Sequence, residues 1–307
     1  MVPPAFEAIL SMSTDTIPEL PSQIVQHRAL VEQALENYLN FGLDCPAQLR
    51  EAMAYMLLSG CKRIRPVLTL CAAEACGGNI QTAIPAACAV EMIHTYSLIH
   101  DDLPSMDDDE FRRGQLTCHL KFDEATAILA GDALQARAFE LLAECPAESV
   151  GPSVAVLAWA SGPNNLVGGQ VDDLAGCHES PSLEKLQHIH RRKTAALLIA
   201  SLKLGGISAG TTPENLNRLE KYGEKLGLAF QIVDDLLDFD GDPSRMGKQS
   251  GKDLENGTMT FPGFLGPARS REMAAQLIAE AIQEIQPFGD AANNLQGIAK
   301  FVLNRDF

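Results

Sequence analysis

The sequence lacks the features that mark secreted, disulfide-stapled and membrane-spanning proteins. Its eight cysteines include no Cys-x-x-Cys pair, and several lie in Ala/Leu-rich stretches where a reduced cysteine acts as a small apolar residue. No segment approaches the run of about 18 apolar residues that a membrane span needs. Residues 1–20 have no basic segment followed by a long apolar run, so no signal peptide is expected there. These absences predict a protein of the reducing cytoplasm.

Positive charge is also scarce. The chain has 40 Asp and Glu against 24 Lys and Arg, which gives a net charge of −16. A protein with this charge repels nucleic acids and anionic membranes, so neither is an expected partner. Any anionic substrate must therefore be held by a local group of cations and not by the general electrostatic field.

Alternation with period two, internal repeats and low-complexity linkers are missing as well, while apolar residues recur at helical spacing along most of the chain. The segment 82–100 is apolar around its whole circumference, which predicts a buried central helix. We expect one all-α domain of roughly ten helices over residues 23–307, preceded by a flexible tail at 1–22. The predicted helices cover residues 24–41, 46–59, 66–76, 82–100, 121–144, 152–170, 182–204, 213–239, 269–286 and 290–304.

Two clusters of aspartates lie about 130 residues apart, at 101–109 and 234–238. Several carboxylates in a small volume repel one another unless a cation holds them together, and oxygen ligands alone favour Mg²⁺ or Ca²⁺ over zinc. Basic residues accompany both clusters and suit a metal ion that also carries phosphate. They are Arg112 and Arg113 after the first cluster, and Lys248 and Lys252 after the second.

The placement of the aspartates supports a shared metal site. Asp101 ends the predicted buried helix, and the loop after it can bring Asp107 back towards the same point. Asp234 and Asp238 are four residues apart on an apolar helix and so share one face. The alternative for each cluster is a solvated acidic surface, but two clusters carried on apolar helices argue against it. An EF-hand at 238–249 is excluded, because its sixth position is proline and its twelfth is glutamine.

Polar residues elsewhere could bind the phosphate. Lys62 and Arg65 are three residues apart at a helix start, where backbone amides attract anions, although a solvated basic turn would look the same. His94 lies seven residues before Asp101, and its alternative is an ordinary packed histidine. Three further polar residues interrupt apolar helices, namely Lys193, Thr194 and Gln231.

These motifs, in their order along the chain, resemble those of the trans-prenyl diphosphate synthases, and in particular the bacterial farnesyl/geranylgeranyl diphosphate synthase type. The resemblance covers residues 25–305. It is carried by GCKRIRP at 60–66, DDLPSMD at 101–107, RRGQLTCH at 112–119, GQVDDL at 169–174, HRRKT at 190–194 and QIVDDLLD at 231–238.

The resemblance implies a single all-α bundle around a deep central cavity, homodimeric, that binds three Mg²⁺ ions through the substrate diphosphate. It implies that isopentenyl diphosphate is held by Lys62, Arg65, His94 and Arg113. The Mg²⁺ ligands would be Asp101, Asp107 and Asp234, supported by Asp102, Asp235 and Asp238. The allylic diphosphate would be surrounded by Arg112, Lys193, Thr194, Gln231, Lys248 and Lys252. The catalytic set would be Asp101, Asp107, Asp234, Lys193 and Arg112.

The implied reaction is the Mg²⁺-dependent head-to-tail condensation of isopentenyl diphosphate with an allylic diphosphate. Tyr96 and Ser97 lie five and four residues before Asp101, about 6–7.5 Å along the helix. A ring at this place would close the cavity early, which predicts the C15 product farnesyl diphosphate, unless Tyr96 only packs against a neighbouring helix. The alternative product is C20 geranylgeranyl diphosphate.

Two other functions are less well supported. A class I terpene cyclase would not need the second diphosphate site that Lys62, Arg65 and Arg113 indicate. A non-catalytic partner subunit would be expected to have lost aspartates or the arginine pair. The chain departs from the family pattern at Cys61, Leu116 and Ala195, none of which removes a charged residue, so we expect an active enzyme with weakened binding of isopentenyl diphosphate.

Overall fold

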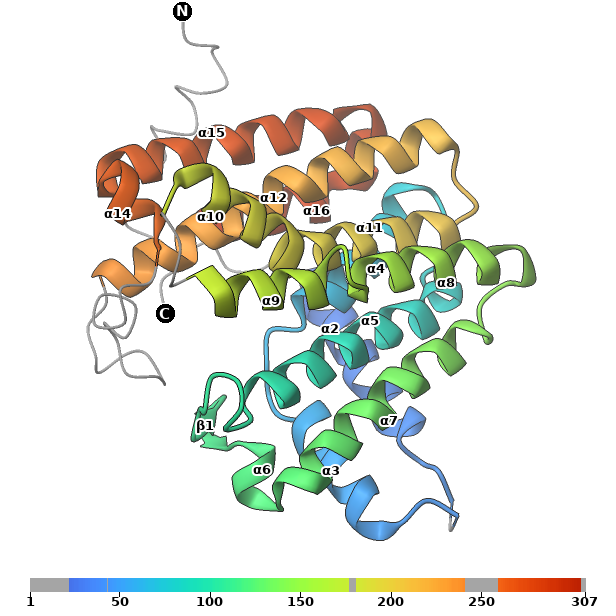
Figure 1. Ribbon diagram of the computed structural model, residues 1–307. Helices are drawn as coiled ribbons and strands as arrows, with labels where there is room; N and C mark the ends of the chain where they lie inside the picture. Colours follow the sequence, from blue (N-terminus) through green and yellow to red (C-terminus); the bar gives the residue numbers. More distant parts are fainter. Residues whose placement is uncertain (1–21, 43, 177–180, 241–258, 305–307) are drawn as a thin grey trace, which may run out of the picture.

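The computed structural model describes residues 22–42, 44–176, 181–240 and 259–304, and these residues are mostly helical (Figure 1). The predicted all-α architecture is confirmed. Most of the predicted tail, residues 1–21, lies outside the described residues, as do Lys248 and Lys252. None of the described helices is both long and apolar enough to cross a membrane.

The helices follow one another along the chain with short connections. The first eight are α2 (Ser22–Tyr38), α3 (Ala47–Leu57), α4 (Ile64–Ala75), α5 (Ile80–Asp101), α6 (Cys118–Lys121), α7 (Glu124–Leu142), α8 (Ala147–Ser161) and α9 (Leu166–Gly176). The rest are α10 (Leu183–His190), the π-helix η1 (Arg191–Ala195), α11 (Ala196–Ser208), α12 (Pro213–Asp240), α14 (Phe261–Leu265), α15 (Pro267–Ile285), the 3₁₀ helix η2 (Gln286–Ala292) and α16 (Asn293–Asn304).

Helix α5 is the centre of the bundle, as its apolar circumference predicts. It packs against α4, α7 and α11, and α11 packs in turn against α12, which carries α15 (Figure 1). The helix begins where the Asn79 side chain accepts a hydrogen bond from the Gln81 amide, which satisfies one of the unpaired donors of the first turn. It ends at Asp101, so the first aspartate cluster emerges directly from the core.

Two of the predicted helices are interrupted in the structure. The segment predicted at 152–170 is split into α8 and α9 by a turn at 162–165, and the segment at 182–204 contains the π-helical turn η1. Arg192 joins the two interruptions, because its guanidinium donates to the carbonyls of Pro163 and Asn164 (2.9 Å each) and pairs with Asp172. The two interruptions therefore have one cause: Arg192, which belongs to the π-helical turn η1, holds the turn between α8 and α9 in place.

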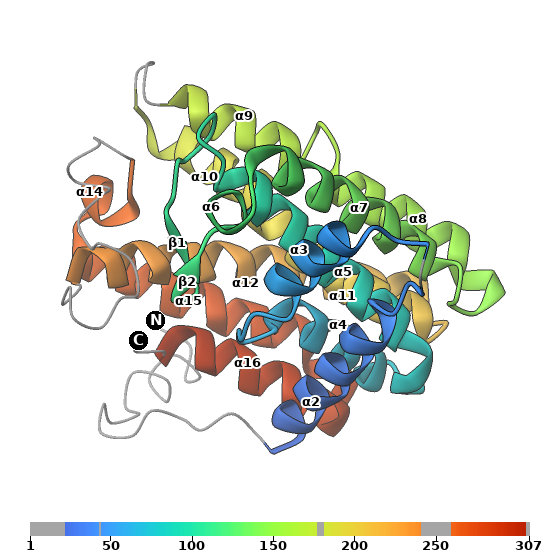
Figure 2. The ribbon, with the colours of Figure 1, turned by 90° about the horizontal axis from the view of Figure 1, so that it is seen from below.

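A small β-hairpin follows the first aspartate cluster, although the sequence pattern indicates no strand. It pairs β1 (Phe111–Arg112) with β2 (Gln115–Leu116), and both turn residues have positive φ, 54° at Arg113 and 76° at Gly114. These angles are those of a type I′ turn. Figures 1 and 2 place the hairpin and the C-terminal end of α12 at the same end of the molecule. Both aspartate clusters therefore come to that end.

One buried group away from this end contains metal-ligand residue types. His27, Cys71 and Glu74 are the only such group among the residues that the structure describes. The His27 imidazole meets the Cys71 sulfur with Nδ1 (3.6 Å) and the Glu74 carboxylate with Nε2 (3.2 Å). Because the two ring nitrogens face different partners, the group is a hydrogen-bonded chain that ties α2 to α4.

Candidate active site

A cavity of about 510 Å³ lies beside the C-terminal half of α5. Its polar end is formed by Arg65, His94, Asp101, Lys193 and Thr194. The remainder is mainly apolar, with Tyr96 and Ser97 on its wall. The other lining side chains include Leu103, Met106, Ile128, Leu166, Val167, Val171, Leu174 and Leu197. The cavity therefore joins a charged mouth to an apolar interior, which suits a molecule with a charged head and a hydrocarbon tail.

Asp101 contributes a carboxylate to the polar part of the cavity. Its side chain is only 12% exposed, and Oδ1 has no hydrogen-bond partner among the described residues. Burial raises the pKa of Asp101 from 3.8 to about 6, against the lowering effect of Lys193, and the nearby charge of Asp107 raises it further. The Asp107 amide donates to the Asp101 carbonyl (2.9 Å), so the loop returns as the sequence predicts. A buried carboxylate oxygen without a donor fits a metal cation.

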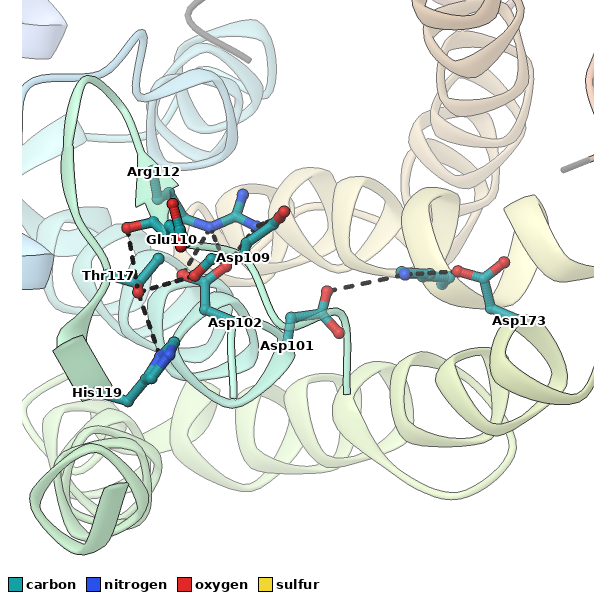
Figure 3. Close-up of polar contacts among 9 residues, drawn as sticks. Asp101, Asp102, Asp109, Glu110, Arg112, Thr117, His119 and Asp173 are labelled. Carbon is teal, nitrogen blue, oxygen red and sulfur yellow. Dashed lines mark hydrogen bonds and ion pairs between the residues drawn. The ribbon is translucent and has the colours of Figure 1, made fainter. Parts of the chain in front are cut away.

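Lys193 stands between two carboxylates. Its ammonium donates to Oδ2 of Asp173 at 2.7 Å and lies 3.8 Å from Oδ2 of Asp101 (Figure 3). Asp173 belongs to the GQVDDL motif of α9, but no local sequence pattern predicts that its carboxylate pairs with Lys193 across two helices.

Arg112 is already engaged by the first aspartate cluster. Its Nε donates to both oxygens of the buried Asp102 (2.6 and 2.8 Å), and its Nη2 lies 3.4 Å from Asp109 (Figure 3). The Thr117 hydroxyl donates to the Asp109 carbonyl (2.9 Å) and lies 3.2 Å from Nδ1 of His119. In the structure Asp102 therefore holds Arg112 in place, a contact that the predicted supporting role in metal binding does not include.

The type I′ turn separates the two adjacent arginines. Arg113 leaves the turn towards the segment that follows α3, where its Nη1 donates to the Ser59 hydroxyl (2.9 Å), whereas Arg112 faces the aspartates. Burial lowers the pKa of His94 well below 6.5, and the charges of Arg65, Arg113 and Arg112 lower it further. Three of the predicted isopentenyl diphosphate residues, Arg65, His94 and Arg113, thus lie together. Lys62 is exposed, with its ammonium 5.6 Å from the Phe301 ring centroid.

Arg63 has a structural position that the basic run 60–66 does not reveal. It is buried, has φ 50°, and donates to Glu32 (2.9 and 3.1 Å) and to the buried Glu91 (2.7 Å). Its neighbours Lys62 and Arg65 are consequently placed on either side of an anchored turn. The thiol of Cys61 donates to the same Glu91 oxygen (3.6 Å), so this departure from the family pattern adds a contact to the anchor.

The aspartates of the second cluster differ in their burial and contacts. Asp235 is buried and accepts hydrogen bonds from the Phe261 amide (2.9 Å) and the Gln231 side chain (3.2 Å). The Gln231 oxygen in turn accepts from the Thr194 hydroxyl (3.2 Å). Asp234 and Asp238 are partly exposed on α12. Burial lowers the pKa of Arg65, and the charges of Glu91 and Asp234 oppose that effect, so Asp234 lies near Arg65, which lines the cavity together with Asp101.

Two glycines, one in α9 and one in α12, allow these helices to lie close to the π-helix η1. A Cβ at Gly169 of α9 would lie 2.6 Å from the Lys193 nitrogen, and one at Gly227 of α12 would lie 2.5 Å from Cβ of Ala195. Ala195 is a further departure from the family pattern, and Gly227 accommodates it. The third departure, Leu116, keeps the extended pairing with Phe111, and its carbonyl accepts a hydrogen bond from Tyr55 (2.7 Å).

A helical bundle around a cavity with a charged part and an apolar part suits an enzyme that acts on a diphosphate with a hydrocarbon tail. Comparison with known proteins agrees. Residues 46–295 match the polyprenyl synthetase family. A farnesyl diphosphate synthase of Haemophilus influenzae is 47% identical over 84% of this chain and 89% of its own length. A geranylgeranyl diphosphate synthase of Cyanophora paradoxa is 42% identical over 94% and 97%.

Among solved structures, a geranyltransferase from Legionella pneumophila superposes with a TM-score of 0.83 at 35% identity, covering 93% of this chain and 97% of that one. The chain therefore belongs to the polyprenyl synthetase family. It is a prenyltransferase that carries out prenyl chain condensation.

Proposed function

We propose that the enzyme condenses isopentenyl diphosphate head to tail (1′-4) with dimethylallyl and geranyl diphosphates to make farnesyl diphosphate. The observation that carries the proposal is the cavity, whose charged mouth at Asp101 and Lys193 opens into an apolar interior that Tyr96 borders. Tyr96 is only 6% exposed, which supports a wall that stops chain growth early and hence a C15 product. The second candidate is a C20 product, because the relatives include enzymes named for either length.

The aspartates fit Mg²⁺ on the evidence of the uncompensated Oδ1 of Asp101. Asp101, Asp107 and Asp234 would hold the ions, with Asp102 and Asp238 in support, and three ions would bind through the substrate diphosphate. When bound, Mg²⁺ stabilises the negative charge that develops on the departing diphosphate.

The remaining steps belong to the chain's own side chains. Lys193 and Arg112 would donate to the departing diphosphate, as charged donors placed where negative charge grows. The Gln231 oxygen and the carbonyls of the π-helix would face the allylic cation, while the apolar wall excludes water. Arg65, His94, Arg113 and Lys62 would hold isopentenyl diphosphate while its double bond attacks. The released diphosphate would accept the proton that is lost after the new carbon–carbon bond forms. No separate base is then needed.

The test is an incubation of the purified protein with Mg²⁺, isopentenyl diphosphate and each allylic primer in turn, followed by phosphatase treatment and mass spectrometry of the alcohols. Farnesol should predominate, and EDTA should abolish the reaction. Mainly geranylgeraniol would replace the C15 proposal with the C20 one. A cyclic hydrocarbon from an allylic diphosphate alone would indicate a terpene cyclase, and no reaction without another subunit would indicate a non-catalytic partner.

We also propose a cytoplasmic homodimer. Apolar side chains outside the cavity lining are exposed on two consecutive helices and suit burial against a second copy. They are Leu129 of α7 and Val154 and Trp159 of α8. Seven cysteines in the described part of the chain are free thiols, which suits a reducing compartment.

A further inference from the structure

We propose that His100, seated against Gly131 of α7, sets the width of the cavity beside Tyr96, so that Gly131 determines the length of the product. This inference rests on the proposed prenyl chain condensation and deepens it. It concerns residues that lie outside the diphosphate-binding groups described above.

The contacts of His100 fix its ring. Its Nε2 lies 3.0 Å from the carbonyl oxygen of Ile128, and because a carbonyl only accepts, Nε2 carries the proton. The ring meets that of Tyr96 edge to face, with centroids 5.8 Å apart and planes at 76°. All three residues line the cavity. The wall at Tyr96 is therefore braced by a second ring that is itself hydrogen-bonded to α7.

Gly131 provides the room for this ring. It lies inside α7, where glycine is less favourable than alanine, so a packing reason is expected. A Cβ at this position would lie 2.1 Å from Nε2, 2.6 Å from Cδ2 and 2.8 Å from Cε1 of His100. These three atoms belong to the imidazole ring of His100, which is held by its own backbone at one end and by the hydrogen bond to Ile128 at the other. A small rotation therefore does not relieve the overlap, and the whole imidazole must move.

The direction of that movement follows from the packing. The ring lies against α7 at Ile128 and Gly131 and also lines the cavity. A methyl group at position 131 therefore pushes the imidazole into the space that the growing chain would occupy. Removing the imidazole has the opposite effect, because it widens the cavity and takes away the support of Tyr96. The two changes should alter product length in opposite directions.

A cycle of four enzymes tests the inference: the unchanged protein, Gly131→Ala, His100→Ala and the double variant. Gly131→Ala should raise the ratio of C10 to C15 product about tenfold, the discrimination that one methyl group can give. His100→Ala should shift the products towards C20. The double variant should match His100→Ala, since the methyl group then occupies vacated space. Gly151→Ala, where nothing lies within 4 Å of the added Cβ, is the matched control and should leave the ratios unchanged.

Unaltered product ratios in a folded Gly131→Ala enzyme would overturn the inference, as would an equal shift from Gly131→Ala when His100 is already alanine. If Gly131→Ala alone fails to fold by circular dichroism, a folded and active double variant would support the same contact, and an unfolded one would contradict it. Absence of condensation in the unchanged protein would contradict the proposed function itself, an outcome distinct from normal condensation with unaltered ratios.

Discussion

At the scale of single residues, the charge of Asp101 governs how the site responds to pH. Its pKa is raised from 3.8 to about 6, so the folded protein holds this proton more tightly than the unfolded chain does. The corresponding stabilisation is present below about pH 4 and is lost as the pH rises through about 6. Above that range, the folded protein contains a charged, largely buried Asp101 carboxylate whose Oδ1 accepts no hydrogen bond from the residues that the structure describes.

Asp101→Asn keeps the shape of the side chain and removes the titration. Without divalent ions, the variant should gain stability relative to the unchanged protein as the pH rises from about 4 to about 6, measured by urea denaturation. Mg²⁺ with a diphosphate should stabilise only the unchanged protein, and turnover of the variant should fall at least about a hundredfold. Asp108→Asn, on an exposed residue of the same loop, is the control. A stability difference that does not change with pH would contradict the account.

The adjacent arginines allow the two substrates to be separated. Arg113→Ala removes a charge beside Arg65 and His94, so we expect the KM for isopentenyl diphosphate to rise roughly 10- to 100-fold, the value of one charge-assisted hydrogen bond. Lys62→Ala should act in the same direction. Arg112→Ala should instead raise the KM for the allylic substrate. Steady-state kinetics with each substrate varied in turn decides this, and equal effects on both would show that the two sites are wrongly divided.

Tyr96 gives the most direct control of product length. Tyr96→Ala removes the ring from the cavity wall and should move the main product from C15 to C20 or longer, measured by mass spectrometry of the dephosphorylated alcohols. Tyr55→Ala is a matched loss of an aromatic ring away from the cavity lining and should leave the length unchanged. An unchanged product in Tyr96→Ala would mean that the ring only packs against α7.

The sequence allowed the residue types of the site to be predicted better than their partners. Asp101, Lys193, Arg65 and His94 all line one cavity, as their motifs indicate. The role of Arg63 was missed because a buried arginine within a basic run looks like its exposed neighbours, and only Glu91 of α5, 28 residues away, distinguishes it. Such pairings depend on tertiary packing that no local pattern contains.

At the scale of elements, the π-helix η1 is the part most sensitive to packing. It places Lys193 and Thr194 at the cavity mouth, and π-helical turns are often found at functional sites. Gly169→Ala would bring a Cβ within 2.6 Å of the Lys193 nitrogen and 2.9 Å of its Cα, both backbone atoms that cannot rotate away.

We therefore expect Gly169→Ala to reduce turnover by at least about tenfold, because a displacement near 1 Å can cost about a hundredfold in rate. Overexpressed protein should be compared by circular dichroism and steady-state kinetics. Gly151→Ala, where the added Cβ meets nothing within 4 Å, is the control. A fully active Gly169→Ala enzyme would show that η1 tolerates movement.

The presence of the helices can be predicted from the periodicity of apolar residues, whereas the places where two of them are interrupted cannot. The helix at 82–100 and the long helix at 213–239 were predicted nearly to their ends, as α5 and α12. The turn at 162–165 and the bulge of η1 were missed because one extra residue in a turn scarcely changes an apolar pattern. The hairpin was missed because two-residue strands are too short to show alternation.

At the scale of the whole molecule, the exposed apolar residues of α7 and α8 that lie outside the cavity lining predict self-association. Light scattering on a sizing column should give twice the mass of the 33.1 kDa chain. Leu129→Glu, at a residue that is 58% exposed in the single chain, should yield monomers, because it places a charge in a buried interface. Val25→Glu, at a similarly exposed residue on α2, is the control. A monomeric unchanged protein would contradict the prediction.

The type I′ turn has a consequence for how two substrates meet. Arg112 and Arg113 are joined by a single peptide unit, yet Arg112 faces the aspartates and Arg113 faces Ser59. If each holds the diphosphate proposed for it, the spacing between the two headgroups is fixed by covalent geometry and by the backbone angles of one turn. The hairpin would then fix the distance between the reacting carbons, and this distance would stay the same however long the hydrocarbon chain has become.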